Sequence, residues 1–172
     1  GEPPVKQGEE LTKFLGLRWN LMTDSLGIAV DDFNFPEAKT PRMFVKVGAR
    51  IFDLEGWFIP YIITGRGIIQ ESMSSIEWGW DKLAKEETQI KFRDWAGGIK
   101  HLAQYYIPRC WNTPETVGCI PDLHIFCDAG EKAYGAVAYR VVIGRNGIIE
   151  SHIITGKGLV VPTNAKKQAH HN

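Results

Sequence analysis

Asp128 is the residue whose type and position in this sequence first suggest chemistry. It ends an otherwise apolar segment, residues 123–127, and is followed by Ala129 and Gly130. A carboxylate at a strand end in apolar surroundings is costly unless a cation or a hydrogen-bond donor compensates its charge. Two interpretations are open: Asp128 caps a tight connection through Gly130, or it belongs to a functional site.

The three cysteines add little further chemistry. Cys110, Cys119 and Cys127 are odd in number and lack close CxxC pairing, which argues against a disulfide framework or a zinc site. We therefore expect reduced, partly buried thiols and an intracellular protein. The sequence also contains no Walker loop, HExxH motif or GxSxG motif.

The composition limits the classes of protein. The 172 residues include 20 basic and 20 acidic side chains, and 44% are hydrophobic, which is typical of one medium or two small globular domains and excludes a disordered chain. Charged residues and glycines interrupt each apolar run before it reaches the ~18 residues of a membrane span. The first residues, Gly-Glu-Pro-Pro, predict no secretory signal. Because the net charge is zero, a nucleic-acid role would need a local site.

A short β-hairpin and a helical region must come before Asp128. Alternating apolar residues flank a turn-prone segment and predict two antiparallel strands within residues 1–35. Residues 36–110 carry the helical signal, with one helix opened by Pro41 and a longer one ended by Pro108. The longer helix is predicted from apolar residues at spacings of three and four, namely Phe92, Trp95, Ile99, Leu102 and Tyr106.

Between these two helices, residues 60–70 are apolar but contain Gly65 and Gly67, which lower the helix propensity of the segment. After a linker over residues 111–121, the pattern changes to strands. Three β-prone segments follow, and Asn146-Gly147 between the last two is a strong hairpin signal. The sequence therefore predicts an α+β chain with an N-terminal β-hairpin, a helical connection and an antiparallel β-meander within residues 121–172.

Six blocks of sequence occur in an order shared with a known family. Residues 123–139 read LHIFCDAGEKAYGAVAY, residues 13–19 read KFLGLRW, and residues 49–53 read ARIFD. The shorter blocks are Gly79-Trp-Asp81, Ile107-Pro-Arg109, and Lys157 with Val160 and Pro162. Together these blocks, over about residues 11–162, resemble the Pol polyproteins of BEL/Pao-type retrotransposons, in a region catalogued as a Pao retrotransposon peptidase domain.

The resemblance implies a place in the polyprotein. Residues 1–35 would end the reverse transcriptase palm and thumb, residues 36–110 would be a helical connection, and residues 121–172 would be a truncated N-terminal part of a ribonuclease H-like domain. The implied function is structural: the chain would link reverse transcriptase to ribonuclease H and contact the phosphates of an RNA–DNA or DNA duplex. Its other partner would be the remainder of Pol, and we expect self-association through an open sheet edge.

In ribonuclease H folds, the position of Asp128 is one of four carboxylates that hold two Mg²⁺ ions. Two such ions, ~3.5–4 Å apart, need several oxygen ligands. Asp128 is thus a candidate catalytic and metal-binding residue in an incomplete site, since Glu131 falls in a turn, Glu150 lies on a later strand, and no acid follows Pro162. Asp31-Asp32 lacks the Tyr of a polymerase motif and predicts a solvated turn. We expect no stably bound Mg²⁺ and no nuclease or polymerase activity from this chain alone.

Two alternative functions remain. The triplet Asp128-Ala-Gly130 resembles the Asp-Thr/Ser-Gly triplet of aspartic peptidases, in which two carboxylates share a proton, although Ala129 lacks the supporting hydroxyl. The chain would otherwise be a retained transposon-derived protein-interaction module. One departure from the family pattern is Glu55, which stands at an apolar position where an unpaired buried carboxylate would be destabilising.

Overall fold

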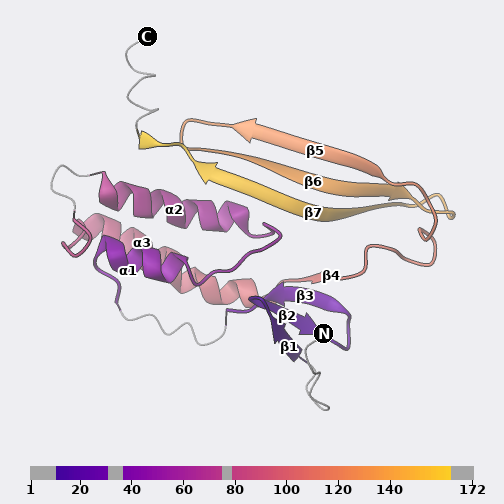
Figure 1. Ribbon diagram of the computed structural model, residues 1–172, viewed down its shortest axis with the longest axis horizontal. Coiled ribbons are helices and arrows are strands. Elements are labelled where there is room, and N and C mark those ends of the chain that lie inside the picture. The colour runs from indigo at the N-terminus through magenta and orange to yellow at the C-terminus, as the bar shows by residue number, and fades with distance from the viewer. Residues whose placement is uncertain (1–10, 31–36, 75–78, 164–172) are drawn as a thin grey trace, which may run out of the picture.

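The computed structural model describes residues 11–30, 37–74 and 79–163. It contains two antiparallel sheets, and the first joins short strands near the N-terminus to one strand that follows the helices (Figure 1). The sheet has the order β1-β2-β3-β4. Its strands are β1 (Leu11–Phe14), β2 (Leu17–Asn20), β3 (Ser25–Ile28) and β4 (Tyr106–Pro108). The predicted N-terminal hairpin is confirmed, and β4 extends it from the far end of the helical region. The predicted turn at Asp31-Asp32 lies outside the described residues.

Helix α1 (Pro41–Gly48) begins as its sequence predicts. The Thr40 hydroxyl accepts a hydrogen bond from the Met43 N–H at 3.4 Å, and Pro41 occupies the first turn, where its missing N–H leaves no bond unmade. Helix α2 (Ile59–Met73) forms despite its glycines. A Cβ on Gly65 would lie 2.2 Å from Cζ2 of Trp95, so this glycine allows the close packing of the two helices.

The predicted long helix is interrupted. Helix α3 (Glu86–Gly98) is followed by a 3₁₀ helix (Ile99–Gln104), and Tyr106 lies in β4, where it pairs with Gly27. The prediction of one helix up to Pro108 is therefore wrong. Gly97 and Gly98 lower the helix propensity at the end of α3. Tyr106, the last residue of the predicted apolar stripe, forms part of a strand pair instead. The rest of the stripe is buried in the core, where Phe92 stacks on Phe44 with ring centroids 4.1 Å apart.

The C-terminal residues form a three-stranded antiparallel sheet in the order β5-β6-β7. Its strands are β5 (Asp122–Ala129), β6 (Ala133–Ile143) and β7 (Ile149–Val160). The predicted hairpin turn is confirmed, since Gly147 adopts a φ of 77° and the Asn146 side-chain oxygen accepts the N–H of Ile148 at 2.9 Å. With helices beside two antiparallel sheets, the predicted α+β class is confirmed.

Helix α2 packs against the C-terminal sheet beside β7 (Figure 1). A Cβ on Gly158 of β7 would lie 2.5 Å from the Cγ2 of Ile59, so the helix and the strand are in close contact. Arg66 and Gln70 of α2 donate hydrogen bonds to the carbonyl oxygens of Gly158 at 3.1 Å and Val161 at 2.8 Å. The helix thus satisfies one backbone carbonyl of β7 and one just after the strand ends.

The cysteines of the described chain are free thiols. Cys110 and Cys127 are exposed and Cys119 is partly buried, so the expectation of partial burial is wrong for two of the three. The cause for Cys127 is its position on β5, every residue of which is exposed. In the part of the chain that the structure describes, no helix has the length and apolar character needed to cross a lipid bilayer.

Candidate functional site

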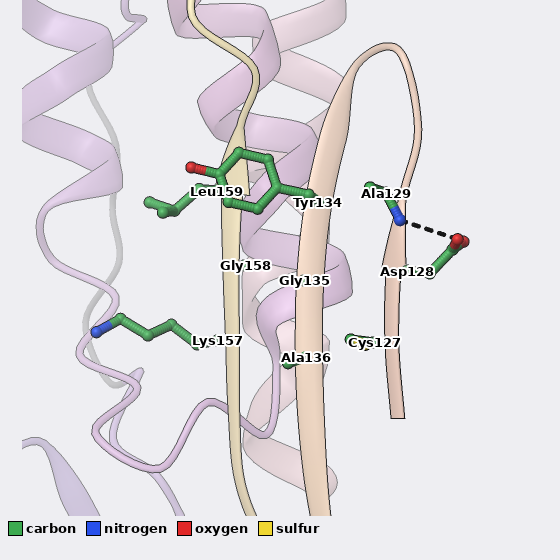
Figure 2. A pocket seen from close by; sticks show the side chains of 9 residues that line it. All are labelled: Cys127, Asp128, Ala129, Tyr134, Gly135, Ala136, Lys157, Gly158 and Leu159. Carbon is green, nitrogen blue, oxygen red and sulfur yellow. Dashed lines mark hydrogen bonds between the residues drawn. The ribbon is translucent and has the colours of Figure 1, made fainter. Parts of the chain in front are cut away.

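Asp128 lies next to the last residue of β5, opposite Gly135 of β6. Its Oδ1 accepts a hydrogen bond from the N–H of Ala129 at 2.9 Å, and the carboxylate points away from Tyr134 and Leu159 (Figure 2). The side chain is exposed to solvent. This contact is local to β5, because both residues belong to the strand, and it leaves the role of Asp128 open.

A hollow of about 580 Å³ lies beside Asp128 on the open face of the sheet. Tyr134, Lys157 and Leu159 project on one side of it (Figure 2), and the small side chains of Cys127 and Ala136 line it from the same face of the sheet. Among these five side chains, Lys157 carries the only charge at neutral pH. The arrangement can bind an apolar group, or an anion at Lys157, but these side chains include no acid–base pair for hydrolysis.

The carboxylates of the described chain do not fit a pair of Mg²⁺ ions. No group of three or more His, Cys, Asp or Glu side chains in the described ranges is placed to hold a metal ion. Glu150 pairs in register with Val142, at the opposite end of β6 from Gly135 and Asp128. Seven residue steps along a strand correspond to about 24 Å. Glu150 instead accepts a hydrogen bond from the Thr113 hydroxyl at 2.9 Å.

A structural position that the sequence reasoning missed is Asp53, in the ARIFD block. Its two carboxylate oxygens accept the N–H groups of Trp57 at 2.9 Å and Phe58 at 2.8 Å, just before α2. An Asp shortly before a helix with no other capping residue is a signal that could have identified it. The same loop places the carbonyl of Glu55 to accept the N–H of Gly156 at 2.8 Å.

The expectation of a buried carboxylate at Glu55 is wrong. Glu55 is only partly buried, and its backbone carbonyl accepts the hydrogen bond from the sheet. A partly exposed carboxylate keeps much of its hydration, so this departure from the family pattern carries a small cost.

Charged residues in two of the family blocks form bidentate ion pairs. Asp81 accepts hydrogen bonds from Arg42 at 2.7 and 3.0 Å, and Asp24 accepts from Arg109 at 2.6 and 2.9 Å. The Arg109 guanidinium also lies 5.2 Å from the centroid of the Trp19 ring, in cation–π geometry. Both pairs join segments far apart in sequence.

These pairs also set the local electrostatics. Hydrogen bonds from Arg109, and secondarily from Trp19, lower the pKa of Asp24, and the hydrogen bond to Arg42 lowers the pKa of Asp81. The two arginine pKa values are raised by the same contacts. Both carboxylates therefore stay ionised and paired, so they can hold two segments of the chain together but are not suited to proton transfer near neutral pH.

Comparison with family models finds a match to the Pao retrotransposon-like RNaseH-like domain over residues 40–169. A comparison with curated proteins finds no significant match. The match includes α1, α2, α3 and the whole β5-β6-β7 sheet, and its description names a ribonuclease H-like domain and no peptidase. The chain therefore belongs to the Pao retrotransposon family, as a region of Pol with a ribonuclease H-like domain.

Proposed function

We propose that this chain is a structural part of the Pol polyprotein that links reverse transcriptase to ribonuclease H. The observation that carries the proposal is that the helical region contacts both sheets. At its C-terminal end, β4 pairs with β3 and Arg109 binds Asp24. In its middle, α2 packs on β7 and donates a hydrogen bond to the carbonyl of Gly158. A segment fastened in this way is suited to hold two domains at a fixed separation.

We also propose that the chain does not cleave nucleic acid by itself. In-line attack on a phosphodiester by two metal ions needs several carboxylates converging on one point. Asp128 lies at one end of the sheet and Glu150 at the other, and the Asp128 carboxylate accepts a hydrogen bond from the N–H of Ala129. An aspartic peptidase of the retroviral kind would instead need the Asp128 carboxylates of two copies to share one proton, and Ala129 lacks the hydroxyl that supports such a pair.

A nuclease assay tests the catalytic part of the proposal. The 172-residue chain is incubated with an RNA–DNA hybrid in Mg²⁺, beside the Asp128→Asn variant. We expect no cleavage above background with either protein. Cleavage by the unchanged chain that Asp128→Asn abolishes would overturn this part of the proposal.

The duplex contact is proposed to involve Lys157, which projects beside the hollow on the open sheet face (Figure 2). Contacts from cationic side chains to phosphates give binding that weakens with salt, with a slope of about −0.9 per phosphate for duplex DNA. Fluorescence anisotropy with a labelled duplex, over a salt series, measures this slope.

We expect Lys157→Gln to weaken duplex binding and to make the salt slope less negative by about one unit. Lys46→Gln, at an exposed position on α1, is the matched control and should leave the slope unchanged. Equal effects of the two variants would show that Lys157 has no particular role, and absence of binding at low salt would overturn the duplex contact.

A further inference from the structure

Helix α3 changes directly into the 3₁₀ helix that follows it. Ile99 is the first residue of the 3₁₀ helix, and its N–H donates to the carbonyl of Ala96, three residues back. In a continuing α-helix, the same N–H would donate to the carbonyl of Trp95, four residues back. The 3₁₀ helix covers six residues, and because such runs rarely exceed three or four, its length calls for a specific cause.

Tyr61 of α2 gives a new partner to the carbonyl that the Ile99 N–H leaves. The Tyr61 hydroxyl donates a hydrogen bond to the carbonyl of Trp95. The indole N–H of Trp95 donates in return to the carbonyl of Tyr61 at 3.0 Å, and the two rings stack with centroids 5.6 Å apart. Burial raises the pKa of Tyr61, so its hydroxyl remains a donor at neutral pH.

Gly98 leaves space for this hydroxyl at the end of α3. A Cβ on Gly98 would lie 2.6 Å from the hydroxyl oxygen of Tyr61, but 3.4 and 3.5 Å from the ring carbons Cε2 and Cζ. The φ of Gly98 is −78°, which other residues also adopt. The glycine therefore provides space for the hydroxyl at this position, and its conformational freedom is not needed.

The geometry of the 3₁₀ helix decides how the chain reaches β4. Compared with α geometry, six residues of 3₁₀ geometry add about 3 Å of length and about 120° of rotation. The chain then enters β4 beside β3, where Tyr106 pairs with Gly27 (Figure 1). A Cβ on Gly27 would lie 2.9 Å from the carbonyl oxygen of Tyr105, so the two strands tolerate little displacement here.

We propose that Tyr61 is the positioning residue that ends α3 at Gly98 and so sets how the N-terminal sheet attaches to the helical region. It does so by binding the Trp95 carbonyl, which the change to 3₁₀ geometry would otherwise deprive of its partner. The inference rests on the proposed linking function and deepens it, because that function depends on the contacts of the helical region with both sheets. Its tests involve neither nucleic acid nor nuclease activity, so the two proposals can fail separately.

The pairing of β4 with β3 offers a local reporter of this attachment. The Arg109 N–H donates to the carbonyl of Asp24 at 3.0 Å, just beyond the end of the strand pair. Because hydrogen-bonded pairs alternate along an antiparallel ladder, Leu26 and Ile107 form the next such pair. Protection of the Ile107 amide from hydrogen exchange therefore measures how firmly β4 is held.

Tyr61→Phe removes the hydroxyl and keeps the ring. The Ile99 N–H can then satisfy the Trp95 carbonyl only by extending α3, which loosens β4. We expect exchange of the Ile107 amide to accelerate roughly three- to tenfold more than exchange of the β6 amides, as for the local loss of one hydrogen bond. Tyr105→Phe is the matched control, because Tyr105 is 55% exposed, and it should leave these rates unchanged.

Two results of this experiment would overturn the proposal. One is an unchanged rate for the Ile107 amide in Tyr61→Phe. The other is an equal acceleration at Ile107 and throughout β6, because it would show a general loss of stability without a positioning effect.

A double-mutant cycle tests the contact between Tyr61 and Gly98. Gly98→Ala displaces the hydroxyl in the unchanged chain, whereas in the Tyr61→Phe background the new methyl group meets only ring carbons, at 3.4 Å or more. We expect Gly98→Ala to raise the equilibrium constant of urea unfolding at least about threefold more in the unchanged chain than in that background. Gly97→Ala is the control, since a Cβ there meets nothing within 4 Å, and it should act equally in both. Equal effects of Gly98→Ala in the two backgrounds would overturn the proposal.

Discussion

Gly56 and Gly156 approach each other backbone to backbone, so closely that a Cβ on Gly56 would lie 1.9 Å from the carbonyl oxygen of Gly156. Gly56 also adopts a φ of 75°, in the left-handed region that favours glycine. The carbonyl of the preceding Glu55 accepts the N–H of Gly156. This contact joins the loop before α2 to β7, and it makes the helical layer and the C-terminal sheet a single packed unit.

Gly56→Ala is therefore expected to destabilise the fold strongly. The methyl group would collide with backbone, which has little freedom to move, and the φ angle would be strained. We expect a loss of about 2 kcal/mol or more in the free energy of unfolding, measured by urea denaturation. Gly67→Ala is the control, because a Cβ there meets nothing within 4 Å, and it should stabilise α2 by roughly 0.5–1 kcal/mol. Equal effects of the two changes would contradict the close approach.

Asp53→Ala is expected to weaken the start of α2. The change removes the acceptor for the N–H groups of Trp57 and Phe58, in the loop that leads into α2, and the loss of two hydrogen bonds at about 1 kcal/mol each should cost about 1–2 kcal/mol. Asp53→Asn keeps one acceptor oxygen and should cost less. The measurement is the urea midpoint of each variant. Equal stability of the alanine variant and the unchanged chain would show that the two bonds contribute nothing.

The features that the sequence predicted correctly are local. The turn at Asn146-Gly147 follows from the φ preference of Gly and the side-chain acceptor of Asn. The start of α1 follows from Thr40 and Pro41. The place of Asp128 near the end of a strand is also local.

The features that the sequence could not predict depend on residues far apart in the chain. The pairing of Tyr106 with Gly27 turns the end of an apolar helical stripe into a strand, and no periodicity reveals that partner. The partial burial of Glu55 goes with a contact between its own carbonyl and the distant Gly156. Tertiary contacts of this kind override local propensity.

The ion pair of Asp24 with Arg109 predicts a specific dependence of stability on pH. The hydrogen bond from Arg109, followed by that from Trp19, lowers the pKa of Asp24 in the folded state. A carboxyl group with a lowered folded pKa stabilises the fold above its unfolded pKa of about 3.9. That contribution is lost as pH falls through the folded pKa.

Asp24→Asn should therefore lower the urea midpoint near neutral pH, and its difference from the unchanged chain should shrink in acid. Asp122→Asn, at an exposed position at the start of β5, controls for the removal of one negative charge. A constant difference for Asp24→Asn across the whole acid range would show that the paired charge does not contribute. High salt should also reduce the difference, because the pair lies at the surface.

Arg140 holds the linker onto the C-terminal sheet, and its loss is expected to release the linker locally. The buried guanidinium donates to the carbonyl of Trp111 at 3.0 Å and to the side-chain oxygen of Asn112 at 2.8 Å. Arg140→Met keeps an apolar stem of similar length but removes both hydrogen bonds. Two such bonds, at about 1 kcal/mol each, correspond to an increase of at least about tenfold in the population of the open linker.

Chymotrypsin cleavage after Trp111 under native conditions reports this opening, because proteolysis follows the population of the open form when closing is fast. Arg145→Met is the matched control, since Arg145 donates one exposed hydrogen bond to the carbonyl of Val117, and it should change the cleavage rate much less. A common rate for both variants and the unchanged chain would mean that the linker is held by other contacts. Both effects can be expressed as free energies, one from urea unfolding and one from the cleavage rate. If Arg140→Met lowers the global free energy of unfolding by as much as it lowers the free energy of opening, the linker and the sheet open together.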